Sequence, residues 1–173
     1  MIRKHKRFSR PRKAFDIIRI DEENKLVSKY GLKSKREIWK ANSRISEIRN
    51  QAKKRITAGQ EEQKALINKL NKIGLNVSQI SDILALKKED WLKRRLQSVI
   101  VDKNIAKTPK AARQLIAHKH IAINGNIVNI PSYIVPVDEE NEITLVRMKT
   151  IEMHKKSKKE TGKKTEEGEE NGK

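Results

Sequence analysis

The sequence predicts an α+β protein made of an extended basic arm, a helical domain, a second domain of two helices packed on a small antiparallel sheet, and a disordered charged tail. Three observations predict this class. Apolar residues recur at three- and four-residue steps between residues 35 and 73, an Asn-Gly pair separates two alternating apolar runs, and residues 155–173 contain no aliphatic or aromatic side chain. The expected boundaries are 1–20 for the arm, 21–90 for the helical domain, 91–154 for the second domain and 155–173 for the tail.

The charge of the chain favours a polyanionic partner. Of its 173 residues, 41 are Lys or Arg and 22 are Asp or Glu, which gives a net charge of +19 at pH 7. Such an excess is typical of proteins that bind nucleic acid. No run approaches the roughly 18 apolar residues of a membrane-spanning helix, and the chain has no cysteine. We therefore expect a soluble intracellular protein with no membrane partner, no disulfide and no thiolate metal site.

The first twenty residues have the composition of a binding arm. Residues 2–20 hold eight Lys or Arg and a single Asp, with Phe8, Pro11 and Phe15 interleaved among them. Because no helical or strand period persists here, we expect an extended arm. A merely solvated tail is the alternative, but aromatic side chains are depleted from such tails and pack well on bases and sugars. The cations assigned to nucleic-acid binding in this arm are Arg3, Lys4, Lys6, Arg7, Arg10, Arg12 and Lys13.

The helical domain begins with two capping signals. Asp21 is placed to cap a short helix that ends near Gly31. Ser34 and Glu37 have the spacing of a capping box. In this motif each of the two side chains accepts a hydrogen bond from the backbone amide of the other residue. A second, longer helix is therefore expected to begin at Ser34.

The longer helix is amphipathic and carries a basic side. Its apolar stripe, which runs until Gly59, consists of Ile38, Ala41, Ile45, Ile48, Ala52 and Ile56. Lys40 and Arg44 lie off this stripe, so we assign them to the nucleic-acid surface. A third helix is expected from Gln60 to Ile73, and a short apolar segment follows with Ile80, Ile83 and Leu84.

The second domain is expected to contain two helices and a hairpin. One helix is predicted from Trp91 to Lys103, with a reversal at Asn104, and another from Pro109 to about Lys119, with Thr108 as N-cap. The Asn124-Gly125 pair predicts a tight β-hairpin. The remaining elements expected are strands at Tyr133–Val137 and Glu142–Val146, joined by an acidic turn at Asp138–Asn141.

This second domain also concentrates basic charge. Residues 91–137 hold eight Lys or Arg against one carboxylate, Asp102. If the two helices pack by their apolar faces, Arg94, Arg95, Lys110 and Arg113 are expected on one surface suited to two phosphate strands. The N-terminus of the second helix near Thr108 adds backbone donors. Charge alone predicts binding to RNA or DNA, with a solvated basic face as the bland alternative.

Other kinds of site are not supported by the sequence. His118 and His120 have neither a cysteine nor a third histidine nearby to complete a metal site, and contact with RNA or a place at a helix–strand junction explains them better. The chain has no Gly-rich phosphate loop and no Ser-His-Asp constellation, so no catalytic residue, enzyme activity or cofactor is expected. Trp39 and Trp91 border apolar helical stripes and are interpreted as packing residues rather than platforms for bases.

The motifs of both halves resemble those of a known family. Those of the second half are Arg94-Arg95-Leu96-Gln97, Ala112-Arg113-Gln114-Leu115-Ile116, His118-Lys119-His120-Ile121, Asn124-Gly125 and Val128-Asn129-Ile130-Pro131-Ser132-Tyr133. They resemble the RNA-binding domain, also called the alpha-L motif, of the small-subunit ribosomal protein S4 family. The same domain occurs in pseudouridine synthases, tyrosyl-tRNA synthetases and ribosome-rescue proteins. The motifs of the first half are similar to the archaeal and eukaryotic branch of the ribosomal family, and they are Pro11-Arg12-Lys13-Ala14-Phe15, Asp21-Glu22-Glu23, Tyr30-Gly31-Leu32 and Lys35-Arg36-Glu37-Ile38-Trp39.

The resemblance implies a primary binder of small-subunit (16S-type) rRNA that nucleates assembly of the 5′ domain. It also implies a place among neighbouring small-subunit proteins close to the mRNA entry site, with a contribution to translational accuracy and possible contact with mRNA. Asn104 stands where many bacterial relatives have Gly, and the zinc-binding cysteines of some relatives are absent. A free-standing RNA chaperone or ribosome-rescue factor is the alternative, and a scaffold that binds only proteins is a weaker one. The residues that would face RNA in the second domain are Arg94, Arg95, Lys107, Thr108, Lys110, Arg113, His118 and Lys119.

Overall fold

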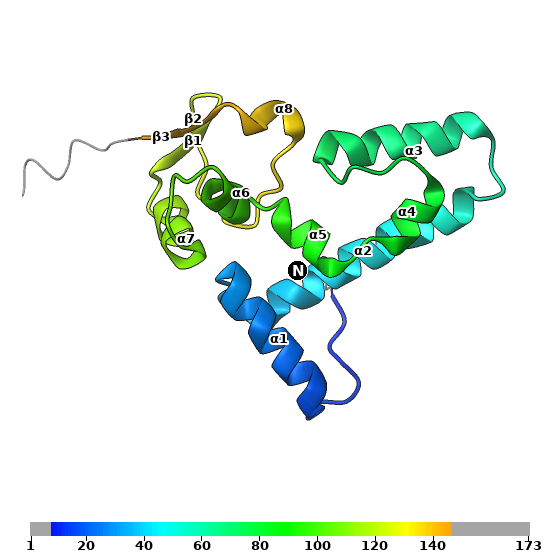
Figure 1. Ribbon diagram of the computed structural model, residues 1–173, viewed down its shortest axis with the longest axis horizontal. Coiled ribbons are helices and arrows are strands. Elements are labelled where there is room, and N and C mark those ends of the chain that lie inside the picture. The colour runs from blue at the N-terminus through cyan, green and yellow to red at the C-terminus, as the bar shows by residue number, and fades with distance from the viewer. Residues whose placement is uncertain (1–7, 147–173) are drawn as a thin grey trace, which may run out of the picture.

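The computed structural model describes residues 8–146, and Figure 1 shows a mostly helical molecule with a small sheet at one end. The elements, in chain order, are α1 (Ile17–Tyr30), α2 (Lys35–Arg55), α3 (Gln60–Ile73), α4 (Ile80–Ala85), α5 (Lys88–Lys93), α6 (Leu96–Asp102), α7 (Pro109–Ala117), β1 (Ile121–Ile123), β2 (Asn126–Ile127), α8 (Val137–Glu140) and β3 (Ile143–Leu145). This architecture confirms the predicted α+β class. The tail over 155–173 and the arm residues Arg3, Lys4, Lys6 and Arg7 lie outside the described residues.

The long helix α2 organises the first half of the chain (Figure 1). Its predicted apolar stripe is buried from Ile38 to Ala52. The first part of this stripe packs with α1 and α5, whereas the later part packs with α3 and α4. The stripe ends one turn earlier than predicted, because Ile56 lies beyond the last helical residue and is 53% exposed. Helix α3 has the predicted bounds, and Gly74 ends it in the left-handed conformation with φ 86°.

The start of α1 corrects the predicted arm. Asp16 rather than Asp21 is the N-cap, and its side chain accepts a hydrogen bond from the Arg19 amide. The helix therefore begins at Ile17, inside the segment that was expected to be extended. The Arg19 guanidinium stabilises this corner further, because it donates to the carbonyls of Lys13 and Ala14 at 2.8 and 3.0 Å.

The capping box predicted at α2 is not formed as a box. Ser34 is the N-cap, but its side chain makes no capping hydrogen bond. The carboxylate of Glu37 accepts from the Lys33 amide at 3.2 Å and otherwise turns toward the second half of the chain. The Ser-x-x-Glu spacing thus predicted the start of the helix correctly. Its prediction that Glu37 caps the helix was wrong.

The predicted helix from Trp91 to Lys103 is wrong, because the chain breaks it into α5 and α6 at Arg94 and Arg95. At the break, backbone groups bond to a later segment instead of continuing the helix. The Leu96 amide donates to the Tyr133 carbonyl at 2.7 Å, and the Val135 amide donates to the Arg94 carbonyl at 3.1 Å. The segment predicted as a strand at Tyr133–Val137 forms this bracing loop, with a single bridge between Arg95 and Ile134. The expected boundary between residues 90 and 91 falls inside α5, and the division into domains stays a prediction.

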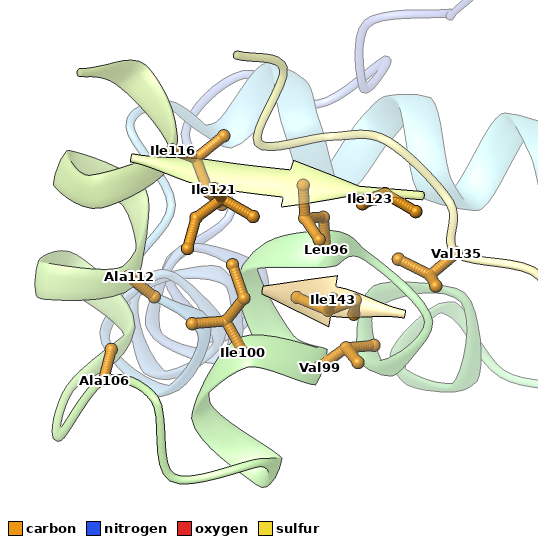
Figure 2. Close-up of a cluster of buried hydrophobic side chains, with 10 residues drawn as sticks. All are labelled: Leu96, Val99, Ile100, Ala106, Ala112, Ile116, Ile121, Ile123, Val135 and Ile143. Atoms are coloured by element: carbon orange, nitrogen blue, oxygen red, sulfur yellow. The ribbon is translucent and has the colours of Figure 1, made fainter. Parts of the chain in front are cut away.

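The sheet closes the second half with strand order β2-β1-β3, all antiparallel. The predicted hairpin is confirmed: Asn124 and Gly125 have φ values of 51° and 76°, as a two-residue turn with both φ angles positive requires. The acidic segment predicted as a turn forms the short helix α8. Figure 2 shows the aliphatic core that this sheet shares with α6 and α7, with Ile121 and Ile123 facing Leu96 and Ile100.

The second predicted helix, α7, has the expected start. Thr108 is its N-cap and accepts from the Ala111 amide at 3.2 Å, Pro109 is the first helical residue, and Asn104 reverses the chain before it with φ 58°. The helix ends at Ala117, two residues before the predicted end at Lys119.

Candidate nucleic-acid interface

A groove of about 810 Å³ lies where the two halves of the chain meet. One wall is the exposed edge of α2, the floor is the junction of α5 and α6, and the opposite wall is the segment 131–134; α7 closes one end. We call this the central groove. Its charged and hydrogen-bonding side chains are Glu37, Lys40, Arg44, Glu47, Trp91, Arg95, Arg113 and Ser132.

Three of these side chains form an ion cluster at the base of the groove. Glu37 is bonded by Arg95 Nη2 through one carboxylate oxygen and by Arg113 Nη2 at 3.0 Å through the other. Burial alone would raise the pKa of Glu37, but the hydrogen bonds and charges of Arg113 and Arg95 outweigh it, so the pKa lies below its ordinary value. We refer to Glu37, Arg95 and Arg113 as the Glu37 cluster.

The two arginines of the Glu37 cluster differ in how far they are buried. Arg95 is only 5% exposed, and its Nε has no hydrogen-bond partner within residues 8–146. Arg113 is half-buried and also approaches the Gln97 side-chain oxygen at 3.4 Å. Arg113 therefore presents part of its guanidinium to the groove, whereas Arg95 forms part of its floor.

Of the four cations that the sequence led us to expect on one surface, Arg95 and Arg113 line the central groove, whereas Lys110 and Arg94 do not. Arg94 turns the other way, toward α3 and α8. Its Nε donates to the Ile73 carbonyl at 2.8 Å, and its Nη2 donates to the Val135 carbonyl at 2.9 Å and to Glu140 at 3.0 Å. A Cβ at Gly74 would lie 2.6 Å from this guanidinium, so the glycine also makes room for it. Arg94 therefore connects the end of α3, in the first half of the chain, to Val135 and α8 in the second half.

Lys40 and Arg44 lie on the α2 wall of the groove and are exposed. Their exposure was predicted, because both lie off the apolar stripe of the helix. Arg44 lies over the indole of Trp91, with its guanidinium carbon 5.7 Å from the ring centroid, and pairs with Glu47 at 2.8 Å. Trp91 also packs against the cores on both sides of α2. This agrees with its interpretation as a packing residue.

The two ends of α7 carry the remaining predicted site residues. Lys107, Thr108 and Lys110 are exposed at its N-terminus, where free backbone amides and the helix dipole favour an anion. His118 and Lys119 are exposed at the other end. These two groups are therefore separated by the length of the helix and do not form one compact patch.

Lys119 has an unusual backbone conformation. It ends α7 with φ 63°, and its amide donates to the Ile116 carbonyl while the His120 amide donates to the Leu115 carbonyl. This is the pattern of a helix terminus that favours Gly at the left-handed residue. A lysine there costs backbone strain and projects an ammonium group into solvent.

The described part of the arm differs from the expectation at its aromatic residues. Phe8 packs on Trp39 with ring centroids 6.1 Å apart, so it anchors the arm to α2. Phe15 is 91% exposed at the corner before α1, and Arg10, Arg12 and Lys13 are exposed beside it.

Two important residues were missed by the reasoning from sequence. Glu37 was assigned to a helix cap and Gln97 was given no structural role, yet both lie where the halves meet. Gln97 is 1% exposed, and its Nε2 lies within 3.0 Å of the carbonyls of Tyr30, Gly31 and Pro109. The sequence held no clear signal for Gln97, because α6 also contains the polar residues Ser98 and Asp102.

Residues 8–146 contain no group of three His, Cys, Asp or Glu side chains placed to hold a metal ion. His118 and His120 lie 6.4 Å apart between ring centroids. In the same range, no helix combines the length and the apolar composition needed to cross a membrane.

Comparison with known proteins assigns a family to this arrangement. The family model of the S4 domain matches residues 94–141, which include α6, α7 and the hairpin. The Small ribosomal subunit protein uS4 of Methanococcus aeolicus is 44% identical over 133 residues, covering 73% of this chain and 75% of the relative. The uS4 proteins of Thermoplasma volcanium and Saccharolobus islandicus are 42% and 47% identical, covering 80% and 72% of this chain and 74% and 73% of their own lengths.

Proposed function

Because the chain belongs to the uS4 family of small ribosomal subunit proteins, we propose that it is a structural constituent of that subunit and binds its rRNA. The observation that carries the proposal is the convergence of cations from distant segments on one side of the molecule. Lys40 and Arg44 come from α2, and Arg113 comes from α7, yet all three line the central groove. Cations from both halves would neutralise phosphates bound there and release the counterions condensed on the RNA.

We propose individual RNA contacts from the exposure of each side chain. The RNA contacts proposed in the described residues are Lys40, Arg44, Lys107, Thr108, Lys110, Arg113, His118, Lys119, Arg10, Arg12 and Lys13. Arg94 and Arg95 are not proposed as RNA contacts, because their guanidinium groups bond to other residues of the chain. Their proposed role is to stabilise the fold. Arg3, Lys4, Lys6 and Arg7, in the arm before residue 8, are proposed as further RNA contacts.

The finer role follows the family resemblance. The chain binds the 5′ domain of small-subunit rRNA early, and this contact helps to nucleate assembly of the body of the subunit. Its neighbours are other small-subunit proteins near the mRNA entry site, where it contributes to translational accuracy. Its place in the cell is the cytoplasmic ribosome, and it performs no catalysis.

Sedimentation of ribosomes from cells that make the tagged chain tests the ribosomal role. We expect one copy per mature small subunit, retained after washing at high salt. Substoichiometric binding that appears only under stress would contradict this role and would support the alternative, a free-standing RNA chaperone or rescue factor that uses the same domain.

Removing two cations at the N-terminus of α7 is expected to weaken the salt dependence of RNA binding. In the variant Lys107→Ala/Lys110→Ala, the slope of log affinity against log salt concentration should fall by about two, because two phosphate contacts are lost. Binding of the full-length chain to small-subunit rRNA is measured by filter retention over a salt series.

The matched control is Lys69→Ala/Lys72→Ala on α3, which removes the same charge from an exposed surface away from the groove. An equal change of slope in both variants would show that only the net charge of the chain matters, and would sink the assignment of the α7 surface.

Replacing Lys119 by Gly is expected to change stability and RNA affinity in opposite directions. Glycine relieves the strain at φ 63°, so the free energy of unfolding should rise by about 1 kcal/mol. Loss of the ammonium should lower the affinity for rRNA about fivefold. Urea denaturation and filter retention measure the two effects, and a variant with unchanged affinity would remove Lys119 from the proposed contacts.

A further inference from the structure

The central groove has the size and lining of a site for one unstacked nucleotide. Its volume of about 810 Å³ is within the range of small-molecule sites in proteins, which is about 300–1,000 Å³. A double helix does not fit between walls that enclose so little space. A single nucleotide turned out of its strand does.

A stacking surface is already assembled on the α2 wall. The Arg44 guanidinium lies over Trp91, which places a planar cation at the edge of the groove with an indole behind it. Bases turned out of RNA strands stack on such guanidinium planes as well as on aromatic rings. Glu47, which pairs with Arg44, holds this cation near the wall.

Donors for a phosphate lie at the base of the same groove. Arg113 presents part of its guanidinium there, whereas Arg95 is 95% buried and forms part of the floor. Glu37 fixes the direction of both guanidinium groups, so these donors are oriented before a ligand binds.

The opposite wall is equally fixed. Ser132 lines the groove from a segment whose neighbour Tyr133 is bonded on both sides: its carbonyl accepts from the Leu96 amide, and its hydroxyl donates to Glu139 at 2.7 Å. The Ser132 hydroxyl can therefore donate to or accept from a base edge opposite Arg44.

We propose that the central groove holds one nucleotide turned out of an RNA strand, with its base between Arg44 and Ser132 and its phosphate near Arg113. The proposal rests on the rRNA-binding function above and names the form of RNA that the groove takes. A protein side chain or a backbone phosphate alone would not use the stacked guanidinium.

Tryptophan fluorescence of the full-length chain tests the occupant. The chain has two tryptophans, so a signal lost in Trp91→Phe is assigned to the groove. A single-stranded RNA pentanucleotide should quench this emission, and an RNA duplex of equal charge should not. Equal quenching by both probes would overturn the proposal.

The Arg44→Lys variant separates stacking from charge, because lysine keeps the cation and removes the planar guanidinium. Its affinity for the pentanucleotide should fall about tenfold, the loss expected for one stacked base. Arg36→Lys, on an exposed face of the same helix outside the groove, is the matched control and should bind like wild type. Equal affinity of the two variants would overturn the proposal.

A photoreactive amino acid at position 132 tests the site in assembled small subunits. We expect a crosslink to one rRNA nucleotide, whereas a crosslink to a protein would overturn the proposal in favour of a protein occupant. The two proposals can fail separately. If wild type binds rRNA tightly but the emission of Trp91 does not respond, the nucleotide site is wrong; if wild type does not bind rRNA, the proposed function is wrong.

Discussion

Replacing Glu37 by Gln is expected to lower the free energy of unfolding by about 3 kcal/mol. The side chain is mostly buried, at 16% exposed, and accepts hydrogen bonds from two arginines, of which Arg95 is itself buried. A neutral amide leaves the charge of Arg95 without its counterion in a site with little water, which costs far more than the loss of a surface ion pair. Urea denaturation at neutral pH measures the change.

The control for this variant is Glu47→Gln, on the same helix and also in an arginine pair, but half exposed. It should change the free energy of unfolding by less than about 0.5 kcal/mol. Equal effects at the two positions would show that burial of the Glu37 cluster contributes nothing to stability.

The stabilisation by Glu37 should also depend on pH. Its pKa is lowered in the folded chain, so the folded state favours the charged form. The contribution is therefore complete above the pKa of the unfolded chain and is lost as the pH falls through the lower pKa of the folded chain. The difference in unfolding free energy between wild type and Glu37→Gln should be constant near pH 7 and shrink toward about pH 3. A difference that grows in acid would contradict the direction of the shift.

Replacing Gln97 by Leu is expected to cost a similar amount, about 3 kcal/mol. Its amide lies against three carbonyls, those of Tyr30 and Gly31 at the end of α1 and that of Pro109 at the start of α7. Leucine has a similar volume but leaves the buried carbonyls of α1 without a donor, and water does not reach them. The midpoint of urea denaturation should fall with little change of slope.

The exposed Gln114 on α7 provides the matched control, since Gln114→Leu makes the same chemical change at the surface. The effect at position 97 should exceed the effect at position 114 by about 2 kcal/mol or more. Similar midpoints for the two variants would mean that the Gln97 amide does not join α1 to α7.

Elements with local signals could be predicted from the sequence. Helix α3 ends at a glycine, α7 begins with Thr108 and Pro109, and the hairpin turns at Asn124 and Gly125; each signal acts within a few residues. Local chemistry fixes such elements, and the fold agrees with it. The cations at both ends of α7 could be placed on the surface for the same reason.

The elements that were wrong depend on distant segments. The break at Arg94 and Arg95 exists because the backbone bonds to the loop at 133–135, and nothing near residue 94 in the sequence signals this contact. The assignment of Glu37 to a cap failed similarly, because its two partners come from α7 and from the α5–α6 junction. The expected strand at Tyr133–Val137 has suitable residues, but its backbone braces this break and joins no sheet among residues 8–146.

The separations within the Glu37 cluster have a consequence for synthesis of the chain. Glu37 precedes Arg95 by 58 residues and Arg113 by 76, and the wall that carries Ser132 is made later still. Because a chain grows from its N-terminus, the basic arm and α2 leave the peptidyl transferase long before the groove can close. An incomplete product therefore meets RNA through charge alone, whereas a shaped site exists only once the chain has been made past Ser132.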